Sequence, residues 1–309
     1  MSTRTILRRT LVIITAVLAS ASAQAQIFRA YLASDGNDAN PCTLAAPCRL
    51  LPAALTAVAS GGEIWMLDSA NYNTATVTIG KSVSILAVPG AIGSVVATGG
   101  PAILIAVPAL KIALRNLVIV PLPGTGGTDG VRIEAATTLS IEDSLLANLG
   151  SGVVMIGGGK LAIAGTTIRG SAGVAIVVDE GQADIVATRL INNTNGGVFV
   201  RNFTGGTTHA SITDSLLSGG IFGVRSFTNG ADAVARAFVT RCTIRGTTDA
   251  LSVSAVTGGT SSLSVGSSMV TGNTNAWFVS GNSTLRTIGN NQITDNDGSV
   301  GALTPTTPL

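Results

Sequence analysis

The sequence has few charged residues, few aromatic residues and almost no histidine or lysine. Charged residues make up 11% of the 309 positions and aromatic residues 4%, with one histidine and three lysines. Long helices need Leu, Glu, Lys and Gln, whereas β-branched residues separated by Gly and Asn are typical of short strands. The 38 glycines and the many Val, Ile and Thr residues therefore predict an all-β fold of many short strands.

The first 25 residues have the pattern of a secretion signal. Three arginines precede a short apolar run at 11–18, and positions 23–25 read Ala-Gln-Ala, an Ala-x-Ala cleavage pattern. The apolar run is too short to span a bilayer, which takes roughly 20 residues. We therefore predict a signal peptide cleaved after Ala25 and a secreted or periplasmic chain without a membrane span. An N-terminal anchor is the alternative.

Outside that segment the charges nearly balance. Fifteen basic and 16 acidic residues remain and leave a net charge of −1. Binding to nucleic acid or to an anionic membrane normally depends on an excess of Lys and Arg. The sequence therefore argues against a general nucleic-acid binder.

A short motif, a small residue followed by alternating apolar residues, recurs every 21 to 27 residues. It begins at Gly130, Gly152, Gly173, Gly197, Gly223, Ala250 and Ala276, with an earlier variant at Ala102. A structural unit repeated at such an interval is typical of a solenoid, in which each coil packs on the next. Extra residues after the motif, at 202–211, 226–236 and 254–262, are expected to form loops of variable length.

A second pattern pairs two apolar residues five positions apart, which we expect to fill a core shared between coils. The pairs are Ile112/Leu117, Ile141/Leu146, Ile163/Ile168, Ile185/Leu190, Ile212/Leu217, Val239/Ile244, Val265/Val270 and Ile288/Ile293. The third position after the first apolar residue is small and polar, and should stack along the axis: Ser144, Thr166, Thr188, Ser215, Cys242, Ser268 and Asn291. The seventh should form a bend with positive φ, which Gly, Asn and Asp tolerate best: Asn148, Gly170, Asn192, Gly219, Gly246, Gly272 and Asp295. Each coil should therefore contain three short strands.

With these repeats the chain resembles the pectate-lyase-like superfamily of right-handed parallel β-helices, and residues 31–72 are similar to the start of many secreted β-helix proteins. We expect a right-handed parallel β-helix of about 8 to 10 coils. Leu50, Leu51, Ala54, Leu55 and Val58 recur at helical spacing and predict a short helix that caps the open end of the core.

The expected organisation has four parts. A signal peptide at 1–25 precedes an N-terminal cap with a strand and a helix at 26–62. The β-helix follows at 63–297. Residues 298–309 lack periodicity and are expected to form a loose tail.

The cysteines and the histidine predict structure rather than chemistry. Cys42 and Cys48 are close in an exported chain and should form a disulfide, with two free thiols as the alternative. Cys242 lies in the small polar column and is expected to be buried. His209, expected in a loop, cannot form a zinc site alone. Residues 34–40, SDGNDAN, lack EF-hand spacing and predict an Asx-rich turn, so we expect no metal and no cofactor, with calcium as the weaker alternative.

The motifs of the superfamily's enzymes are missing. Its members cleave or rearrange polysaccharides, but this sequence lacks the Asn-Thr-Asp, Asp-Asp and His-Gly motifs of the hydrolases and the Asp-Pro-His signature of uronate epimerases. Two acidic pairs, Glu142-Asp143 and Asp179-Glu180, are adjacent in sequence, so each pair is split between strand faces or lies in a turn. The resemblance therefore implies a fold rather than an activity, and the catalytic residues remain unidentified.

Alternation in the first-strand motif should send every second side chain outward. The expected outward pairs are Arg132/Glu134, Val154/Ile156, Ala175/Val177, Phe199/Arg201, Arg225/Phe227, Ser252/Ser254 and Phe278/Ser280. Aromatic rings suit the apolar face of a sugar and arginines suit a carboxylate, whereas plain surface packing is the alternative. In the superfamily this strip usually binds the glycan. The candidate ligand-binding residues are Arg132, Glu134, Phe199, Arg201, Arg225, Phe227 and Phe278.

Three functions remain. The favoured one is an exported β-helix that binds a polysaccharide or cell-surface glycan without cleaving it. The second is a polysaccharide lyase or glycoside hydrolase that acts on an acidic polysaccharide and uses Arg225 or Arg201 with Glu134 or Asp232. The third is a structural or adhesive solenoid with protein partners.

Overall fold

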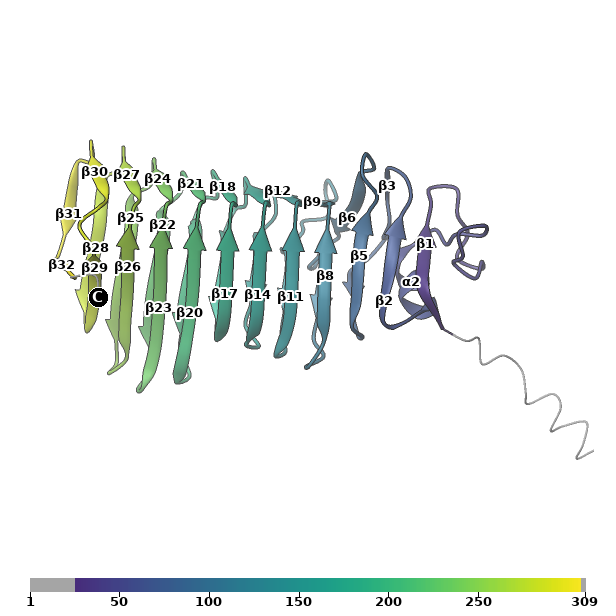
Figure 1. Cartoon of the computed structure of the whole chain (residues 1–309), viewed down its shortest axis with the longest axis horizontal. Coiled ribbons are helices and arrows are strands. Elements are labelled where there is room, and N and C mark those ends of the chain that lie inside the picture. Colours follow the sequence, from purple (N-terminus) through teal and green to yellow (C-terminus); the bar gives the residue numbers. More distant parts are fainter. Residues whose placement is uncertain (1–25, 307–309) are drawn as a thin grey trace, which may run out of the picture.

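The repeat seen in the sequence is a stack of coils. The computed structural model describes residues 26–306, which wind into a parallel solenoid of about nine turns (Figure 1). Each coil contributes one strand to each of three sheets, as predicted, and neighbouring strands run parallel. The predicted signal peptide and anchor alternative lie outside the described residues. No helix in the described part is long and apolar enough to cross a membrane.

Sheet 1 contains the first strand of each coil and has ten strands. They are β4 (Val77–Thr78), β7 (Ile103–Ile105), β10 (Asp129–Ile133), β13 (Ser151–Met155), β16 (Val174–Asp179), β19 (Gly196–Asn202), β22 (Phe222–Asn229), β25 (Asp249–Val256), β28 (Asn275–Gly281) and β31 (Gly298–Val300).

Sheet 2 has twelve strands, which Figure 1 shows side by side along the long axis. They are β1 (Ile27–Leu32), β2 (Val58–Met66), β5 (Val83–Ala87), β8 (Lys111–Arg115), β11 (Thr137–Glu142), β14 (Gly159–Ala164), β17 (Gly181–Val186), β20 (Gly206–Thr213), β23 (Ala233–Thr240), β26 (Thr260–Gly266), β29 (Ser283–Thr287) and β32 (Leu303–Pro305).

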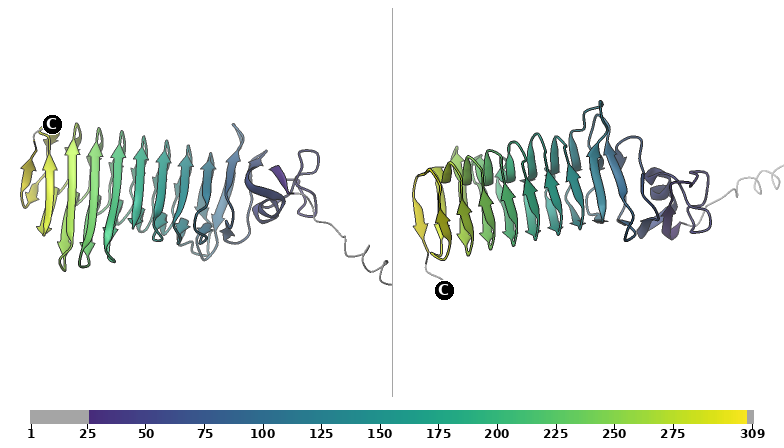
Figure 2. Two further views of the ribbon diagram at one scale, coloured as in Figure 1. Left: turned by 60° about the horizontal axis from the view of Figure 1, so that its bottom comes forward. Right: turned by 90° about the horizontal axis from the view of Figure 1, so that it is seen from above.

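Sheet 3 has ten short strands, each of which follows the sheet 2 strand of the same coil. Figure 2 shows the regular stacking of the coils from two further sides. They are β3 (Ala70–Asn71), β6 (Gly93–Ala97), β9 (Leu117–Pro121), β12 (Leu145–Ala147), β15 (Thr167–Arg169), β18 (Arg189–Ile191), β21 (Leu216–Ser218), β24 (Thr243–Arg245), β27 (Met269–Thr271) and β30 (Gln292–Thr294).

The core includes the apolar pairs that the sequence predicts. From Ile112/Leu117 to Val265/Val270 every member is at most 4% exposed. The last pair is an exception, because Thr287 pairs with Val265 and Ile288 is 44% exposed. The small polar column also stacks as predicted. For example, the backbone N–H of Thr188 donates to the Ser215 hydroxyl, and that of Cys242 donates to the Ser268 hydroxyl.

Two columns of left-handed residues turn each coil. The predicted bend residues, from Asn148 to Asp295, all have positive φ. From Asn148 to Gly272 their backbone N–H groups donate to carbonyls of the next coil, as Asn148 N–H does to the Arg169 carbonyl. A second column lies in the two-residue turn between sheets 2 and 3 and includes Asp143, Ala187 and Arg241, with φ of 48°, 50° and 51°. Their N–H groups also donate to carbonyls one coil further on.

The N-terminal end is closed by a helix and a disulfide. Helix α2 (Leu51–Ala57) buries Leu51, Ala54 and Leu55. Cys42 and Cys48 form the predicted disulfide, and Cys242 is a buried free thiol, as expected. The boundary predicted at 62/63 falls within β2, and β1 already belongs to sheet 2, so the cap is continuous with the solenoid.

Four predictions about chain course are wrong. The tail is not loose from 298, because β31 pairs with β28 and β32 pairs with β29. The extra residues near 202–211, 226–236 and 254–262 mostly lengthen strands of sheets 1 and 2. His209 accordingly lies in β20, beside Gln182, and not in a loop.

The fourth error concerns the coil that begins near Gly173. Val153 pairs with Ile176 rather than with Val174, so Ala175 faces the core and is fully buried. The outward pair of this coil is therefore Val177 and Asp179, not Ala175 and Val177. Asp179 consequently pairs with Arg201 on the outer face of sheet 1.

Candidate functional site

The outer face of sheet 1 brings four of the predicted site residues together. On the adjacent strands β19 and β22, Phe199 pairs with Arg225 and Arg201 pairs with Phe227, as the sequence predicts. All four side chains are partly buried, because each strand lies only about 4.8 Å from the next and their side chains pack side by side.

Two further phenylalanines complete this group. The Phe222 ring packs edge-on against Phe199 at 5.6 Å between centroids, and the Phe203 ring packs against Phe227 at 5.8 Å. Phe199 and Phe227 are themselves 6.3 Å apart. We call the group, Phe199, Arg201, Phe203, Phe222, Arg225 and Phe227, the aromatic–arginine cluster.

Arg225 is the central cation of the cluster. Its guanidinium carbon lies 5.5, 5.9 and 5.4 Å from the ring centroids of Phe199, Phe222 and Phe227. Its Nε is buried and has no hydrogen-bond partner among the described residues. Within residues 26–306 no carboxylate lies within 4.0 Å of it. The charge of Arg225 is therefore not neutralised by a carboxylate of the described chain, which suits an anion from outside the chain.

Arg201 is the second cation, and it is held by an acid. Its Nε lies 3.0 Å from Asp179 Oδ2, and its guanidinium carbon lies 5.5 Å from the Phe199 ring and 5.1 Å from the Phe203 ring. Burial raises the pKa of Asp179, and the attraction of Arg201 offsets only part of that rise. The edge of the cluster thus carries a carboxyl group that holds its proton more tightly than usual.

A glycine shapes the floor of the cluster. Gly196 has φ of 147°, and a Cβ there would lie 2.6 Å from Cδ2 of the Phe222 ring and 2.6 Å from the Phe222 carbonyl oxygen. Since only glycine leaves this space free, Phe222 can lie over the neighbouring strand and contact Phe199.

The other predicted site residues lie apart from the cluster. Arg132 bonds Asp129 at 3.0 Å and Glu134 at 2.7 Å, so its charge is neutralised locally. Strands β13 and β16 separate it from the cluster and carry Val154 and Val177. Phe278 is separated from Arg225 by Ser252 of β25. Asp232 is exposed in the turn before β23. Neither Asp232 nor Glu134, which is paired with Arg132, forms an ion pair with an arginine of the cluster.

Sequence reasoning missed Phe203, Phe222 and Asp179. The wrong register around Gly173 hid Asp179, and its correction places the acid beside Arg201. Phe222 immediately precedes the Gly223 motif, so a prediction that starts each strand at the motif leaves it out. Phe203 lies in the turn between β19 and β20, where strand alternation does not predict the direction of a side chain.

The polar groups of the Asx-rich segment are used within the chain. Asp38 Oδ1 accepts from the N–H groups of Arg49 and Leu50, and Asn37 Oδ1 accepts from Ala39 N–H. This is the predicted Asx-rich turn. No group of three or more His, Cys, Asp or Glu residues in the described ranges is placed to hold a metal.

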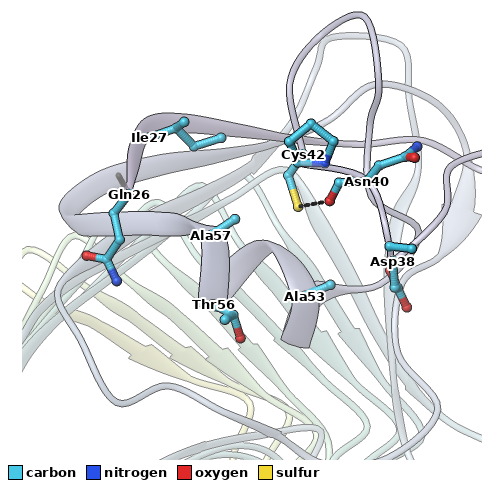
Figure 3. Close-up of a pocket in the computed structure, with 10 residues that line it drawn as sticks. Gln26, Ile27, Asp38, Asn40, Cys42, Ala53, Thr56 and Ala57 are labelled. Atoms are coloured by element: carbon cyan, nitrogen blue, oxygen red, sulfur yellow. Dashed lines mark hydrogen bonds between the residues drawn. The ribbon is translucent and has the colours of Figure 1, made fainter. Parts of the chain in front are cut away.

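A hollow of about 650 Å³ lies at the N-terminal end, between α2 and the disulfide loop (Figure 3). Its lining includes Gln26, Asn40, Ala53 and Thr56, and Asp38 is the one ionisable side chain among the described residues that line it. Because an oxygen of Asp38 is already bonded to the cap of the helix, this hollow offers little chemistry compared with the cluster.

No protein-family model and no curated protein sequence matches this chain. Solved structures do resemble it. The pectate lyase Pel9A matches with a TM-score of 0.58 at 14% identity, over 93% of this chain and 80% of that one. The GH136 lacto-N-biosidase from Eubacterium ramulus matches with a TM-score of 0.56 at 10% identity, over 91% and 68%.

A third match is the alginate lyase from Paenibacillus sp. str. FPU-7, with a TM-score of 0.51 at 12% identity, over 88% of this chain and 100% of that one. At such low identity the likeness establishes the fold alone. The chain is a parallel β-helix of the architecture found in pectate lyase, as its repeats predict.

Proposed function

We propose that this protein binds an acidic polysaccharide or cell-surface glycan at the aromatic–arginine cluster without cleaving it. The observation that carries the proposal is Arg225, a cation held among three phenyl rings with no carboxylate in reach among residues 26–306. The rings offer apolar faces to a sugar, and the free guanidinium donors suit its carboxylate.

The acids of this face favour binding over hydrolysis. Glycoside hydrolysis uses two carboxyl groups about 5–9.5 Å apart on either side of the bond. Asp179 of β16 is paired with Arg201, and Glu134, directly after β10, is paired with Arg132. Strand β13 lies between β10 and β16. Neither acid therefore stands free opposite a second one.

A polysaccharide lyase or hydrolase is the second candidate, and Asp179 is the observation that favours it. A carboxyl group with a raised pKa beside an arginine is a common feature of acid–base sites. The names of the similar structures, pectate lyase, alginate lyase and lacto-N-biosidase, also describe enzymes that act on glycans.

We further propose that the chain is exported. The Cys42–Cys48 disulfide supports this, because such bonds persist mainly in oxidising compartments. Recovery of the chain beginning at Gln26 from the periplasm or medium of an expressing cell would test both export and the cleavage site.

The binding proposal is tested on an array of acidic and neutral glycans with the purified chain from Gln26. We expect selective binding to acidic glycans, weakened in Arg225→Gln and in Phe199→Ala. Arg245→Gln, which removes an exposed arginine from β24 of sheet 3, is the matched control and should bind normally.

Two results separate the alternatives. Unsaturated or newly reducing sugar ends released from a bound glycan, and lost in Asp179→Asn, would establish the enzyme instead. A blank array from a chain with an intact β-sheet spectrum would overturn the binding proposal and leave a structural solenoid with protein partners.

A further inference from the structure

A groove on sheet 2 has the chemistry of a second ligand site. Three residues of β26 with short side chains, Thr260, Ser262 and Ser264, form its floor. Strand β23 carries Val234, Arg236 and Phe238 on one side, and β29 carries Thr284 and Arg286 on the other. The hollow measures about 350 Å³, which is within the range of pockets that hold small ligands.

The groove exists because of the contrast in side-chain length between neighbouring strands. Strands of one sheet lie about 4.8 Å apart, so the two walls stand roughly 10 Å apart across β26. In the pairing, Arg236 is level with Ser262, and Ser264 is level with Arg286. The two arginines therefore stand on opposite walls, offset by one outward position along the groove.

Both arginines are available to a ligand. Arg236 and Arg286 are exposed, and within residues 26–306 neither lies within 4.0 Å of a carboxylate. Among the residues that the structure describes, every other lining residue is neutral. Arg236 also lies in one outward-facing row across the neighbouring strands, level with Lys160 of β14, Gln182 of β17 and His209 of β20. None of these four residues is acidic. The groove thus presents positive charge that nothing in its lining neutralises.

The remaining side chains select among anions. Phe238 is 45% exposed, so a flat apolar face stands next to Arg236. The floor presents three hydroxyl groups, which can donate to and accept from sugar hydroxyls. Guanidinium forks, hydroxyls and one ring together match a sugar that carries a carboxylate or sulfate group.

We propose that the groove over β26 is a binding site for an acidic sugar residue, separate from the aromatic–arginine cluster. The two sites lie on different sheets and share no residue. This site does not depend on the function proposed for the cluster, and each can be lost without the other.

Titration calorimetry of the full chain tests the site with three probes of known composition. These are trigalacturonate, a sulfated chondroitin disaccharide, and maltotriose as the neutral control. A double variant, Arg236→Gln with Arg286→Gln, removes both charges. Ser262→Phe fills the floor but keeps the arginines. Arg245→Gln on sheet 3 is the matched control, and Arg225→Gln reports on the cluster.

We expect at least one acidic probe to bind and maltotriose not to bind. In the double variant and in Ser262→Phe, binding at one site should weaken by about tenfold or more, the loss typical of a charge-assisted hydrogen bond. Arg245→Gln and Arg225→Gln should retain that site. If the cluster binds nothing, a single site sensitive only to the groove variants still supports the proposal.

Other outcomes overturn it. They are no binding of either acidic probe, equal binding of maltotriose, or affinities unchanged in the double variant or in Ser262→Phe. Equally tight binding of a short single-stranded oligonucleotide would show a general polyanion surface instead. Circular dichroism melts of each variant establish that losses of binding do not come from unfolding.

Discussion

Replacement of Gly196 by alanine tests how the aromatic–arginine cluster is built. The new methyl group would meet the Phe222 ring and the Phe222 carbonyl oxygen, each 2.6 Å from the Cβ position. The ring can rotate away, but the carbonyl belongs to β22 and can move only with its strand. We therefore expect the substitution both to destabilise the fold and to displace Phe222 from Phe199.

The magnitude follows from two separable costs. A non-glycine residue at a φ of 147° costs about 1–3 kcal/mol, and overpacking against a neighbouring strand typically costs about 1–3 kcal/mol more. Gly206→Ala is the matched control, because Gly206 also has positive φ, 74°, but has nothing within 4 Å of its Cβ position. It should cost only the conformational part, about 1–2 kcal/mol.

Thermal melts followed by circular dichroism measure the difference. At roughly 2–4 °C per kcal/mol for a chain of this size, Gly196→Ala should melt several degrees below Gly206→Ala. On a Phe222→Ala background the cost of Gly196→Ala should shrink, because part of the clash is gone. Equal melting temperatures for the two glycine variants would refute the argument that Gly196 makes room for Phe222.

Three further predictions concern other parts of the molecule. Burial raises the pKa of the Cys242 thiol, so a thiol reagent should modify it only after unfolding in denaturant, and rapid modification of the native chain would contradict its placement. Burial raises the pKa of Asp179, so the Asp179 carboxyl binds its proton more tightly in the folded than in the unfolded state. The protonated carboxyl therefore contributes to the stability of the fold at low pH. This contribution is lost as pH rises from about 3.9 through the folded pKa. Melts of Asp179→Asn and wild type between about pH 3 and 6 should therefore show the variant gaining relative stability as pH rises, whereas a constant difference would count against a raised pKa. Replacing both Cys42 and Cys48 by serine should cost about 2 kcal/mol in urea unfolding, as expected for a loop this short, and an unchanged midpoint would show that the disulfide does not stabilise the cap.

Much of the fold could be predicted because the repeat reports on packing. An apolar residue such as Ile141 or Ile185 occupies the same core position in every coil, so its spacing in the sequence reflects the stacking directly. The bend column was equally informative, since positive φ favours Gly, Asn and Asp. The neighbouring turn column was not, because Ala187, Arg241 and Ser267 adopt positive φ without belonging to those residue types.

The register of one coil could not be read from a motif alone. GVAI at Gly173 imitates GVVM at Gly152, but the small residue that packs at this corner is Ala175, which aligns with Gly152. The space at this corner determines the register, because a Cβ at Gly152 would lie 2.5 Å from the Ala175 carbonyl oxygen and 2.5 Å from Ile168. A local sequence pattern contains no information about such distances between coils. For this reason the pattern does not predict that Asp179 faces outward beside Arg201.

The constant turn between sheets 2 and 3 has a consequence for how such a protein can vary. From β11 to β27 that turn always contains two residues, while the strands that meet at the edge between sheets 1 and 2 grow from six residues in β16 to eight in β22. Residues added there in pairs preserve which side chains face the core. Natural variants could therefore lengthen or shorten the turn region between sheets 1 and 2, where Phe203 lies, in one coil at a time. The surface chemistry would change there, while the other two turns of each coil would keep the register between coils.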